Sequence, residues 1–420
     1  MSEIADAQAP PAKDPRKLTS GPFVRLWTAY TVNVAGDEFY TLAVPLIAYQ
    51  AGASAGTMSL LYACSLLPQV VMGVLGGVVA DRAERVKILR VSYLCSALTL
   101  LTACVVFGLT GVHLVGLAAT AVLLGATAPV AAAAFDSSIP LYVEPAGLSR
   151  ANAMTEASRT VCVVAGPAAA GVLLGHVAPQ YALLVNALSF IGAFLALHSM
   201  QARTRSAAAF GKTPSSSFGT ALKAGLRHLL KGRSSLQVGV ALSTVINVVF
   251  GAYEPLVVYR LRDQVHASSS TVGLVMACAG AVSLAVALLL SWKAPSRGFM
   301  TVMGVSTTAQ GLSVMVVALS DSVLLIACAQ ASFVSAMLVY TVYWRAMRQA
   351  HVPPGFLGRV SGACRAIAFG GAFLGSVVSY LLLNGILAVD TALLVAGLTV
   401  CVLGTMVIAW SAVSRKTTAM

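Results

Sequence analysis

Charged residues are scarce in this chain of 420 residues, and acidic residues are the scarcest. Asp, Glu, Lys and Arg make up 10% of the sequence, with 14 acidic and 27 basic side chains. Soluble domains carry about 25% charged residues. The composition therefore excludes an ordinary soluble globular domain.

Several chemical signatures are also missing. The sequence has no HExxH, GxSxG or nucleotide-binding loop, and no paired carboxylates at catalytic spacing. No CxxC or Cys/His cluster occurs, which argues against a metal site and a disulfide framework. The eight cysteines stand singly in apolar runs, as small buried side chains do: Cys64, Cys95, Cys104, Cys162, Cys278, Cys328, Cys364 and Cys401. We expect no enzyme activity, no cofactor, no metal and no direct use of ATP.

Long apolar runs are what the sequence does have. Apolar residues make up 58% of the chain and come in runs of about 20, the length that crosses roughly 30 Å of hydrocarbon. Without water each run must satisfy its own backbone, so it forms a helix. The sequence predicts an all-α membrane protein with twelve spans, near 25–49, 57–80, 87–110, 113–135, 152–175, 180–200, 236–259, 271–293, 298–319, 322–345, 360–384 and 390–413.

The basic residues predict the orientation. Nearly all of those outside the spans fall on the side that carries the N-terminus, and the outer loops hold only Arg260 and Arg262. Because cytoplasmic loops are enriched in Lys and Arg, both termini are expected in the cytoplasm of a cell with an inner (plasma) membrane. The formal charge of +13 is explained in this way, without a nucleic-acid partner. The first residues lack the order of a signal peptide.

Five segments follow from this layout. We expect a disordered tail at 1–22, a six-helix bundle at 23–200, a cytoplasmic linker at 201–235, a second six-helix bundle at 236–413 and a tail at 414–420. The linker ends in FGTALKAGLRHLLKG, which alternates basic and apolar residues at helical spacing. Such a helix either lies on the anionic inner leaflet or is a linker without a partner.

The two predicted bundles repeat each other in sequence. Span one ends in PLIAY and span seven in PLVVY, so that Tyr49 corresponds to Tyr259. Thr57 at the start of span two corresponds to Thr271, and Leu148 before span five to Leu357. Two related six-helix halves predict a shared site between them.

The loop between spans two and three carries the most specific motif. GVVADRAERVK over residues 77–87 resembles the signature loop of the major facilitator superfamily, G-x-x-x-D-R-x-G-R-[RK]. Gly77, Asp81, Arg82 and Arg85 match, whereas Glu84 replaces a glycine. The resemblance implies the fold of that superfamily.

The same resemblance implies a role for this loop. In the family the aspartate contacts the N-terminal end of the eleventh helix and holds the two halves together on the cytoplasmic side. Arg359 and Arg365 at that helix would suit a carboxylate partner. The other interpretation is that these charges only set the topology. Arg365 has no acid close in sequence, so it is expected to pair with Asp81, Asp136 or Glu156 across the interface.

Longer stretches resemble one branch of the superfamily, the macrolide-efflux and enterobactin-exporter-like group. They are RLWTAYTVNVAGDEFYTLAVPLIAYQAGASA over residues 25–55, and the segments that precede spans five and eleven. In span five, Gly166, Pro167 and Gly171 partly match the antiporter motif of drug exporters. A packing role for these three residues is an equally open interpretation.

Ionisable residues inside spans are costly and are therefore functional candidates. Asp37 lies in span one with Asn33 and Thr41 on its face, and Glu38 points about 100° away. In span seven, Asn247 is the repeat partner of Asp37, and Glu254 follows on the same face. Burial favours the protonated carboxyl, so these acids can carry protons or attract a cationic substrate. The alternative is buried ion pairs that only stabilise packing.

Other polar and aromatic residues are weaker candidates. Glu156 and Arg159 are three apart and predict a local ion pair. In span ten, one stripe forms either a cavity wall, with Tyr340 contacting substrate, or helix packing: Gln330, Phe333, Met337, Tyr340 and Trp344. Tyr40, Gln69 and Phe250 are further candidates for the substrate site.

The sequence as a whole favours a secondary active exporter of small hydrophobic or amphipathic compounds, such as drugs, antibiotics or other natural products. It would be proton-coupled, work by alternating access and act as a monomer, as is usual in the family. Two alternatives stay open: a proton-coupled importer of the same fold, and a transport-inactive membrane receptor or scaffold.

Overall fold

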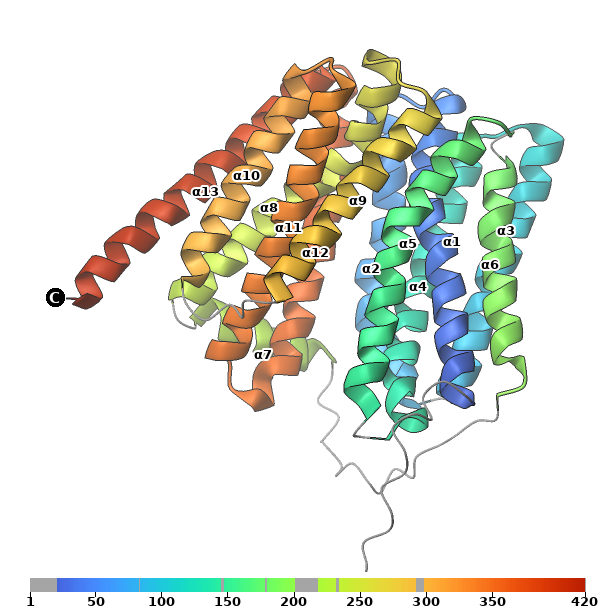
Figure 1. Cartoon of the computed structure of the whole chain (residues 1–420), viewed down its shortest axis with the longest axis horizontal. Coiled ribbons are helices and arrows are strands. Elements are labelled where there is room, and N and C mark those ends of the chain that lie inside the picture. The colour runs from blue at the N-terminus through green and yellow to red at the C-terminus, as the bar shows by residue number, and fades with distance from the viewer. Residues whose placement is uncertain are drawn as a thin grey trace, which may run out of the picture.

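The computed structural model describes residues 21–82, 84–144, 147–177, 180–200, 218–231, 234–291 and 298–419. This part of the chain is helical apart from short connections (Figure 1). The first six helices are α1 (Pro22–Gln50), α2 (Ala55–Arg82), α3 (Arg85–Thr110), α4 (Leu114–Tyr142), α5 (Leu148–Leu174) and α6 (Gln180–His198). The others are α7 (Phe218–Lys231), α8 (Ser234–Tyr259), α9 (Ser269–Ser291), α10 (Phe299–Leu319), α11 (Val323–His351), α12 (Pro354–Leu383) and α13 (Val389–Ala419).

Eleven of the described helices are long and apolar enough to cross a membrane, namely α2 to α6 and α8 to α13. Their outer surfaces expose large apolar side chains such as Leu109 and Val115, which suits a lipid environment. Helix α1 is as long as these but carries Arg25, Asp37 and Glu38. It packs against α4, α5, α6 and α8. The predicted all-helical membrane fold is therefore confirmed, and α1 as a twelfth span stays a prediction.

The helices extend beyond several predicted spans. Helix α4 ends at Tyr142 where 135 was expected, α11 ends at His351 where 345 was expected, and α12 begins at Pro354 where 360 was expected. Six or seven further residues add about 10 Å at 1.5 Å per residue. The apolar pattern marks only the part of a helix that lies in hydrocarbon, because a helix can continue in water without it.

Helix packing repeats between the first and second groups of six helices. Helix α1 packs on α5 and α3 on α6; in the second group α8 packs on α12 and α10 on α13. The most extensive contacts between the groups are two helix pairs, α2 with α12 and α5 with α9. Since α9 corresponds to α2 and α12 to α5, these are the same pair formed twice. We call α1–α6 the N-half and α8–α13 the C-half.

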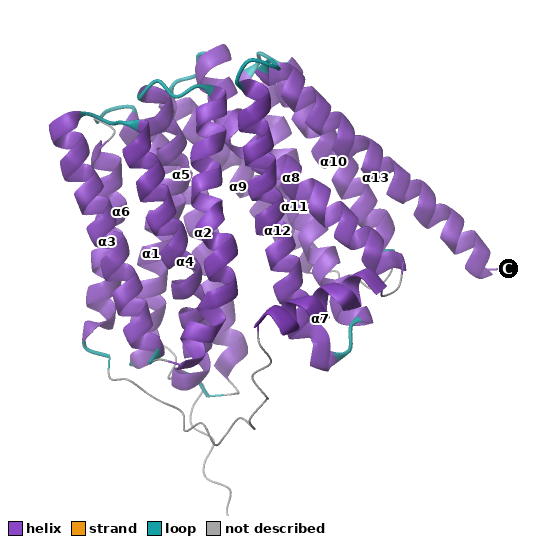
Figure 2. Cartoon of the chain, turned by 180° about the vertical axis from the view of Figure 1, so that it is seen from behind, coloured by secondary structure: helices purple, strands orange, loops and turns teal. Residues whose placement is uncertain are grey.

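The predicted amphipathic helix is present as α7, which lies across the end of the C-half (Figure 2). Gly225 and Leu229 are buried, and Leu229 belongs to the hydrophobic core of the C-half. The helix packs against α12 and α8, and a position of its other face on the inner leaflet stays a prediction. Its exposed face carries Lys223, Leu226, Arg227 and Leu230.

Candidate functional site

The polar groups of α1 form one local network. Asn33 Nδ2 donates a hydrogen bond to Asp37 Oδ2 at 2.5 Å, and Thr41 Oγ1 donates to the Asp37 carbonyl oxygen at 2.9 Å. The face predicted for these three residues is therefore present. The Asp37 carboxyl group lies next to Asn186 of α6 and Tyr93 of α3. Asp37 thus faces the interior of the N-half.

Glu38 faces a different set of helices. It packs against α5, where a Cβ built on Gly166 would lie 2.7 Å from Glu38 Cβ. The charge of Arg159 on α5 acts on the Glu38 carboxyl group, and the charge of Glu38 acts on the carboxyl group of Glu254 on α8. Glu38 of the N-half and Glu254 of the C-half therefore lie within electrostatic reach of each other.

Glu254 is only partly exposed and has aromatic neighbours. Tyr62 of α2 lies within electrostatic reach of its carboxyl group, as does the adjacent Tyr253. The hydroxyl group of Tyr253 donates to Gln330 of α11. The surroundings of Glu254 combine aromatic rings with the Glu38 carboxylate, which suits an amphipathic or cationic molecule.

The remaining candidates in α8 lie further along the same helix. Asn247 Nδ2 donates to the Ser243 carbonyl oxygen at 2.7 Å, so its amide is satisfied within its own helix. Phe250 is partly buried and stacks on Phe333 of α11, with ring centroids 6.4 Å apart. Asn247 and Phe250 therefore contact α8 and α11. Among the described residues, neither makes a hydrogen bond to the Glu254 carboxyl group.

Two candidates lie on α1 and α2. Tyr40 lies near Asp37, and its hydroxyl oxygen is buried without a hydrogen-bond partner. Gln69 Nε2 donates to the Ser65 carbonyl oxygen one turn earlier at 3.1 Å. An unsatisfied buried hydroxyl is unusual and leaves Tyr40 available to a ligand or to a water molecule.

The aromatic stripe of α11 serves helix packing in this structure. Gln330, Tyr340 and Trp344 are almost completely buried. Tyr340 donates a hydrogen bond to the Gly239 carbonyl oxygen on α8 at 3.2 Å, and Trp344 packs over the same glycine. Of the two interpretations of the stripe, the contacts favour packing over a cavity wall.

Charged side chains are exposed within the spans and at the end of α4, on the side toward α7. Glu156 and Arg159 of α5 form the predicted ion pair at 3.1 Å, with 64% and 46% of their side chains exposed. Asp136 of α4 and Arg365 of α12 are also exposed, and the positive charge of Arg365 acts on Asp136. Exposed charges are too costly to face lipid. They therefore indicate water between the halves at this depth.

The two halves meet at one end of the bundle, formed by residues 51–54, 175–177, 265–268 and 384–388, which we call the closed end. The halves diverge from it toward the end that carries α7 (Figure 1). At the closed end the hydroxyl groups of Ser59 on α2 and Ser379 on α12 are 3.0 Å apart and buried.

We call the two contacts between the halves at the closed end, α2 with α12 and α5 with α9, the two seams. The second seam contains glycines of the predicted antiporter motif. A Cβ built on Gly171 of α5 would lie 2.6 Å from the Gly273 Cα atom of α9. A Cβ built on Gly273 would lie 2.8 Å from the Pro167 carbonyl oxygen. The backbones of α5 and α9 are therefore in direct contact, so Gly166, Pro167 and Gly171 have packing roles in this conformation.

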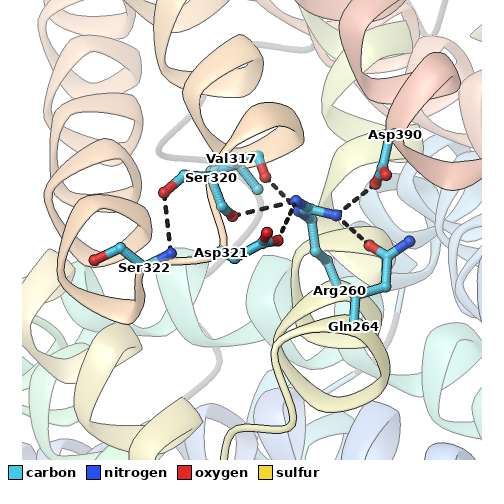
Figure 3. Close-up of polar contacts among 7 residues, drawn as sticks. All are labelled: Arg260, Gln264, Val317, Ser320, Asp321, Ser322 and Asp390. Atoms are coloured by element: carbon cyan, nitrogen blue, oxygen red, sulfur yellow. Dashed lines mark hydrogen bonds and ion pairs between the residues drawn. The ribbon is translucent and has the colours of Figure 1, made fainter.

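Arg260, for which the sequence predicts no role in a site, is 3% exposed and lies just after α8 (Figure 3). Its guanidinium group donates to Asp390 at 2.5 Å and to Asp321 at 3.2 Å. It also donates to Gln264 and to two carbonyl oxygens, those of Val317 and Ser320. The available signal was an arginine on the outer side of the predicted topology, together with two acids in the other outer loops.

Four residues of the predicted cytoplasmic contact have side chains that the structure does not describe: Gly77, Asp81, Arg82 and Arg359. Arg85 begins α3, and Arg365 lies near Asp136, one of the three acids expected to pair with it. The role of the signature loop thus stays a prediction.

Membrane-spanning helices in two repeated halves, with carboxylates from both halves within electrostatic reach of each other, are typical of a membrane transport protein. A family model described as the Major Facilitator Superfamily matches residues 26–376. The chain belongs to this superfamily and is a multi-pass protein of the bacterial inner membrane.

Known relatives are similar along most of the chain. The "Multidrug efflux pump Tap" of Mycobacterium tuberculosis is 24% identical over 378 residues, which cover 87% of this chain and 87% of the relative. The pump of the same name from Mycolicibacterium fortuitum is 28% identical over 182 residues, covering 42% and 44%.

Solved structures agree in fold. The nucleoside transporter NupG has a TM-score of 0.74 at 14% identity, covering 92% of this chain and 98% of that one. A bacterial homologue of the human lysosomal transporter Spinster, in an inward-facing and unoccupied conformation, has a TM-score of 0.70 at 16% identity, covering 97% and 98%. At these identities the likeness concerns the fold alone.

Proposed function

We propose that this protein is a proton-coupled secondary exporter of small hydrophobic or amphipathic compounds that works by alternating access. The similarity to multidrug efflux pumps over 87% of the chain supports the substrate class and the direction. The observation that supports the mechanism is that Glu38 and Glu254, from opposite halves, lie within electrostatic reach of each other. A monomer suffices, because both halves are in one chain.

The orientation belongs to the same proposal. Twelve spans, α1 included, place both termini in the cytoplasm, with the end that carries α7 inside and the closed end outside. The basic residues at the α7 end, such as Lys223 and Arg227, support this arrangement. The conformation described above is then inward-facing, with the charged side chains of α4, α5 and α12 in contact with cytoplasmic water.

The carboxylates of Glu38 and Glu254 give the transport cycle a physical basis. Two negative charges in a low-dielectric site repel each other, and either a proton or a cationic substrate relieves the repulsion. A substrate from the cytoplasm or the inner leaflet binds between Glu38 and Glu254. After the halves rock, protons from outside replace it and permit the return. The positive charge of Arg159 favours the ionised form of Glu38.

Asp37 takes a supporting role in this scheme. It lies inside the N-half, bonded to Asn33 and near the unsatisfied Tyr40 hydroxyl group. From there it can accept a proton that passes Glu38, one residue further along α1. We therefore place the coupling at Glu38 and Glu254, with Asp37 behind them.

The test is efflux of a fluorescent hydrophobic cation from energised cells, with and without a protonophore. Wild type is compared with Glu38→Gln, Asp37→Asn and Glu254→Gln. Glu144→Gln is the matched control, because Glu144 is an exposed carboxylate outside the helices. We expect efflux to collapse with protonophore and in Glu38→Gln and Glu254→Gln, and to persist in Glu144→Gln.

Other outcomes would contradict the proposal in distinct ways. Accumulation of the probe above the level of cells without the gene would indicate import. Full efflux in both Glu38→Gln and Glu254→Gln would refute the coupling site. Absence of any flux for a panel of hydrophobic cations would favour a receptor or scaffold.

A further inference from the structure

The C-terminal end of α8 changes its geometry at the closed end. After Tyr259 the chain forms one π-helical turn, Arg260–Gln264. A π-turn inserts an extra residue per turn and often marks a functional position. Arg260 and Arg262 both lie in this turn, and their side chains have different neighbours.

Arg260 binds only within the C-half. Its partners are Gln264 in the same turn, Val317 and Ser320 of α10 and its C-cap, Asp321 in the next loop and Asp390 at the start of α13 (Figure 3). A buried guanidinium group with two carboxylates and further acceptors is a strong, charge-assisted network. This network fixes the turn to the C-half.

Arg262 and its neighbours cross to the N-half. The guanidinium carbon of Arg262 lies 5.3 Å from the centroid of the Tyr49 ring, at the end of α1. The Tyr49 hydroxyl group donates to the Arg262 carbonyl oxygen at 3.3 Å and lies 3.5 Å from Asp263 Oδ1. The Tyr49 ring also packs edge-on against Tyr259, at 6.0 Å between centroids.

The contacts that cross between the halves are weaker than those that anchor the turn. They comprise long hydrogen bonds and a cation–π contact. Arg262 Nη1 donates to the Ala267 carbonyl oxygen at 2.5 Å, but its Nε atom is buried without a partner. An incompletely satisfied arginine is well suited to a contact that breaks and reforms, because little is lost when it separates.

We propose that the turn Tyr259–Asp263 is the extracytoplasmic gate, with Arg260 as its positioning residue and the Arg262–Tyr49 contact as the part that opens. The proposal rests on the alternating access proposed above. When the closed end opens, Tyr49 leaves with the N-half. The turn stays in place on the C-half because Arg260 holds it to α10 and α13.

A cysteine at position 379 reports on gate opening. Ser379 is 4% exposed and hydrogen-bonded to Ser59 between the halves. In Ser379→Cys, a membrane-impermeant maleimide added outside whole cells labels the thiol only when the closed end opens. The same chain without this substitution gives the background from native cysteines.

We expect Tyr49→Ala and Arg262→Gln to raise the labelling rate about tenfold, which corresponds to ~1.4 kcal/mol. Tyr49→Phe keeps the ring and should give a smaller increase. Glu144→Gln is the matched control, because Glu144 is an exposed carboxylate at the opposite end of the bundle and takes no part in this turn. Unchanged labelling in both Tyr49→Ala and Arg262→Gln would overturn the gate, as would labelling that occurs only from the cytoplasmic side.

Arg260 is tested by non-additivity. If Arg260 acts by positioning the turn against Tyr49, Arg260→Gln raises labelling in the wild-type background and adds nothing in Tyr49→Ala. An effect that adds in full would show a general structural role and overturn the positioning. Arg260→Lys, which keeps the charge, should restore part of the closed state.

The labelling assay needs no substrate, so the two proposals fail separately. Increased labelling in a protein that exports nothing would keep the gate and refute the exporter. Proton-driven efflux with unchanged labelling would keep the exporter and refute the gate.

Discussion

Replacing Gly273 with alanine adds one methyl group where two backbones touch. The new Cβ would lie 2.7 Å from the Gly171 Cα atom, 2.8 Å from the Pro167 carbonyl oxygen and 3.1 Å from the Gly171 nitrogen. These are backbone atoms of α5, so no side chain can move aside. Helices α5 and α9 must separate, and the closed end must loosen.

The magnitude follows from the overpacking, which costs about 1–3 kcal/mol and acts only while the closed end is closed. The gain in helix propensity from alanine, about 0.5–1 kcal/mol, is the same in both conformations and does not change their ratio. The ratio of molecules with the closed end open to molecules with it closed should then rise about five- to 150-fold.

The assay is outside labelling of Ser379→Cys, combined with thermal unfolding in detergent. Gly370→Ala is the matched control, since a Cβ at Gly370 of α12 would meet no atom within 4 Å. It should leave labelling unchanged. Equal labelling of Gly273→Ala and its parent, in a protein that unfolds at the same temperature, would refute the argument that this crossing limits opening.

Three further predictions concern other parts of the molecule. Leu229→Ala should destabilise the protein by about 2–5 kcal/mol, because Leu229 is completely buried. Leu230→Ala, at a position that is 54% exposed, should change the unfolding temperature little. Equal effects of the two substitutions would contradict the docking of α7. Asp136→Arg and Arg365→Asp should each slow efflux while the double exchange restores part of it, and no rescue would show that the two charges act independently. Acidifying the outside medium should accelerate efflux by wild type, since proton entry drives export, whereas the residual flux of Glu254→Gln should not respond. An acceleration that survives the substitution would place the coupling elsewhere.

The sequence predicted the helices well because lipid restricts what a span can contain. Apolar runs of the right length mark the hydrocarbon, and the spans were placed within a few residues except where helices continue into water, as α4 and α11 do. The repeat was also readable, because matches such as Tyr49 and Tyr259 recur at equivalent positions.

The rotation of α1 was not readable in the same way. Asp37 and Glu38 are adjacent, about 100° apart on a helix, and either could face the other half. The answer depends on two tertiary contacts: Gly36 packs closely against Asn186 of α6, and Gly166 of α5 packs against Glu38. Both contacts join helices distant in sequence, and one sequence alone carries no record of them.

The Arg260 network was missed for a related reason. Its partners, Asp321 in a connection and Asp390 at the start of α13, lie far along the chain. Each residue alone resembles an ordinary loop charge. Only the fold brings them to one point.

The two seams at the closed end are equivalent in the repeat but differ in their residues. In one seam Gly56 of α2 faces Asn384 after α12; in the other Ser270 of α9 faces Gly175 after α5, with the small and polar partners exchanged. Tyr49 and Tyr259, which also correspond in the repeat, pack edge-on against each other at this end. In a symmetric dimer every substitution would occur in both seams. Because both seams lie in one chain here, either seam can change while the other keeps its contacts.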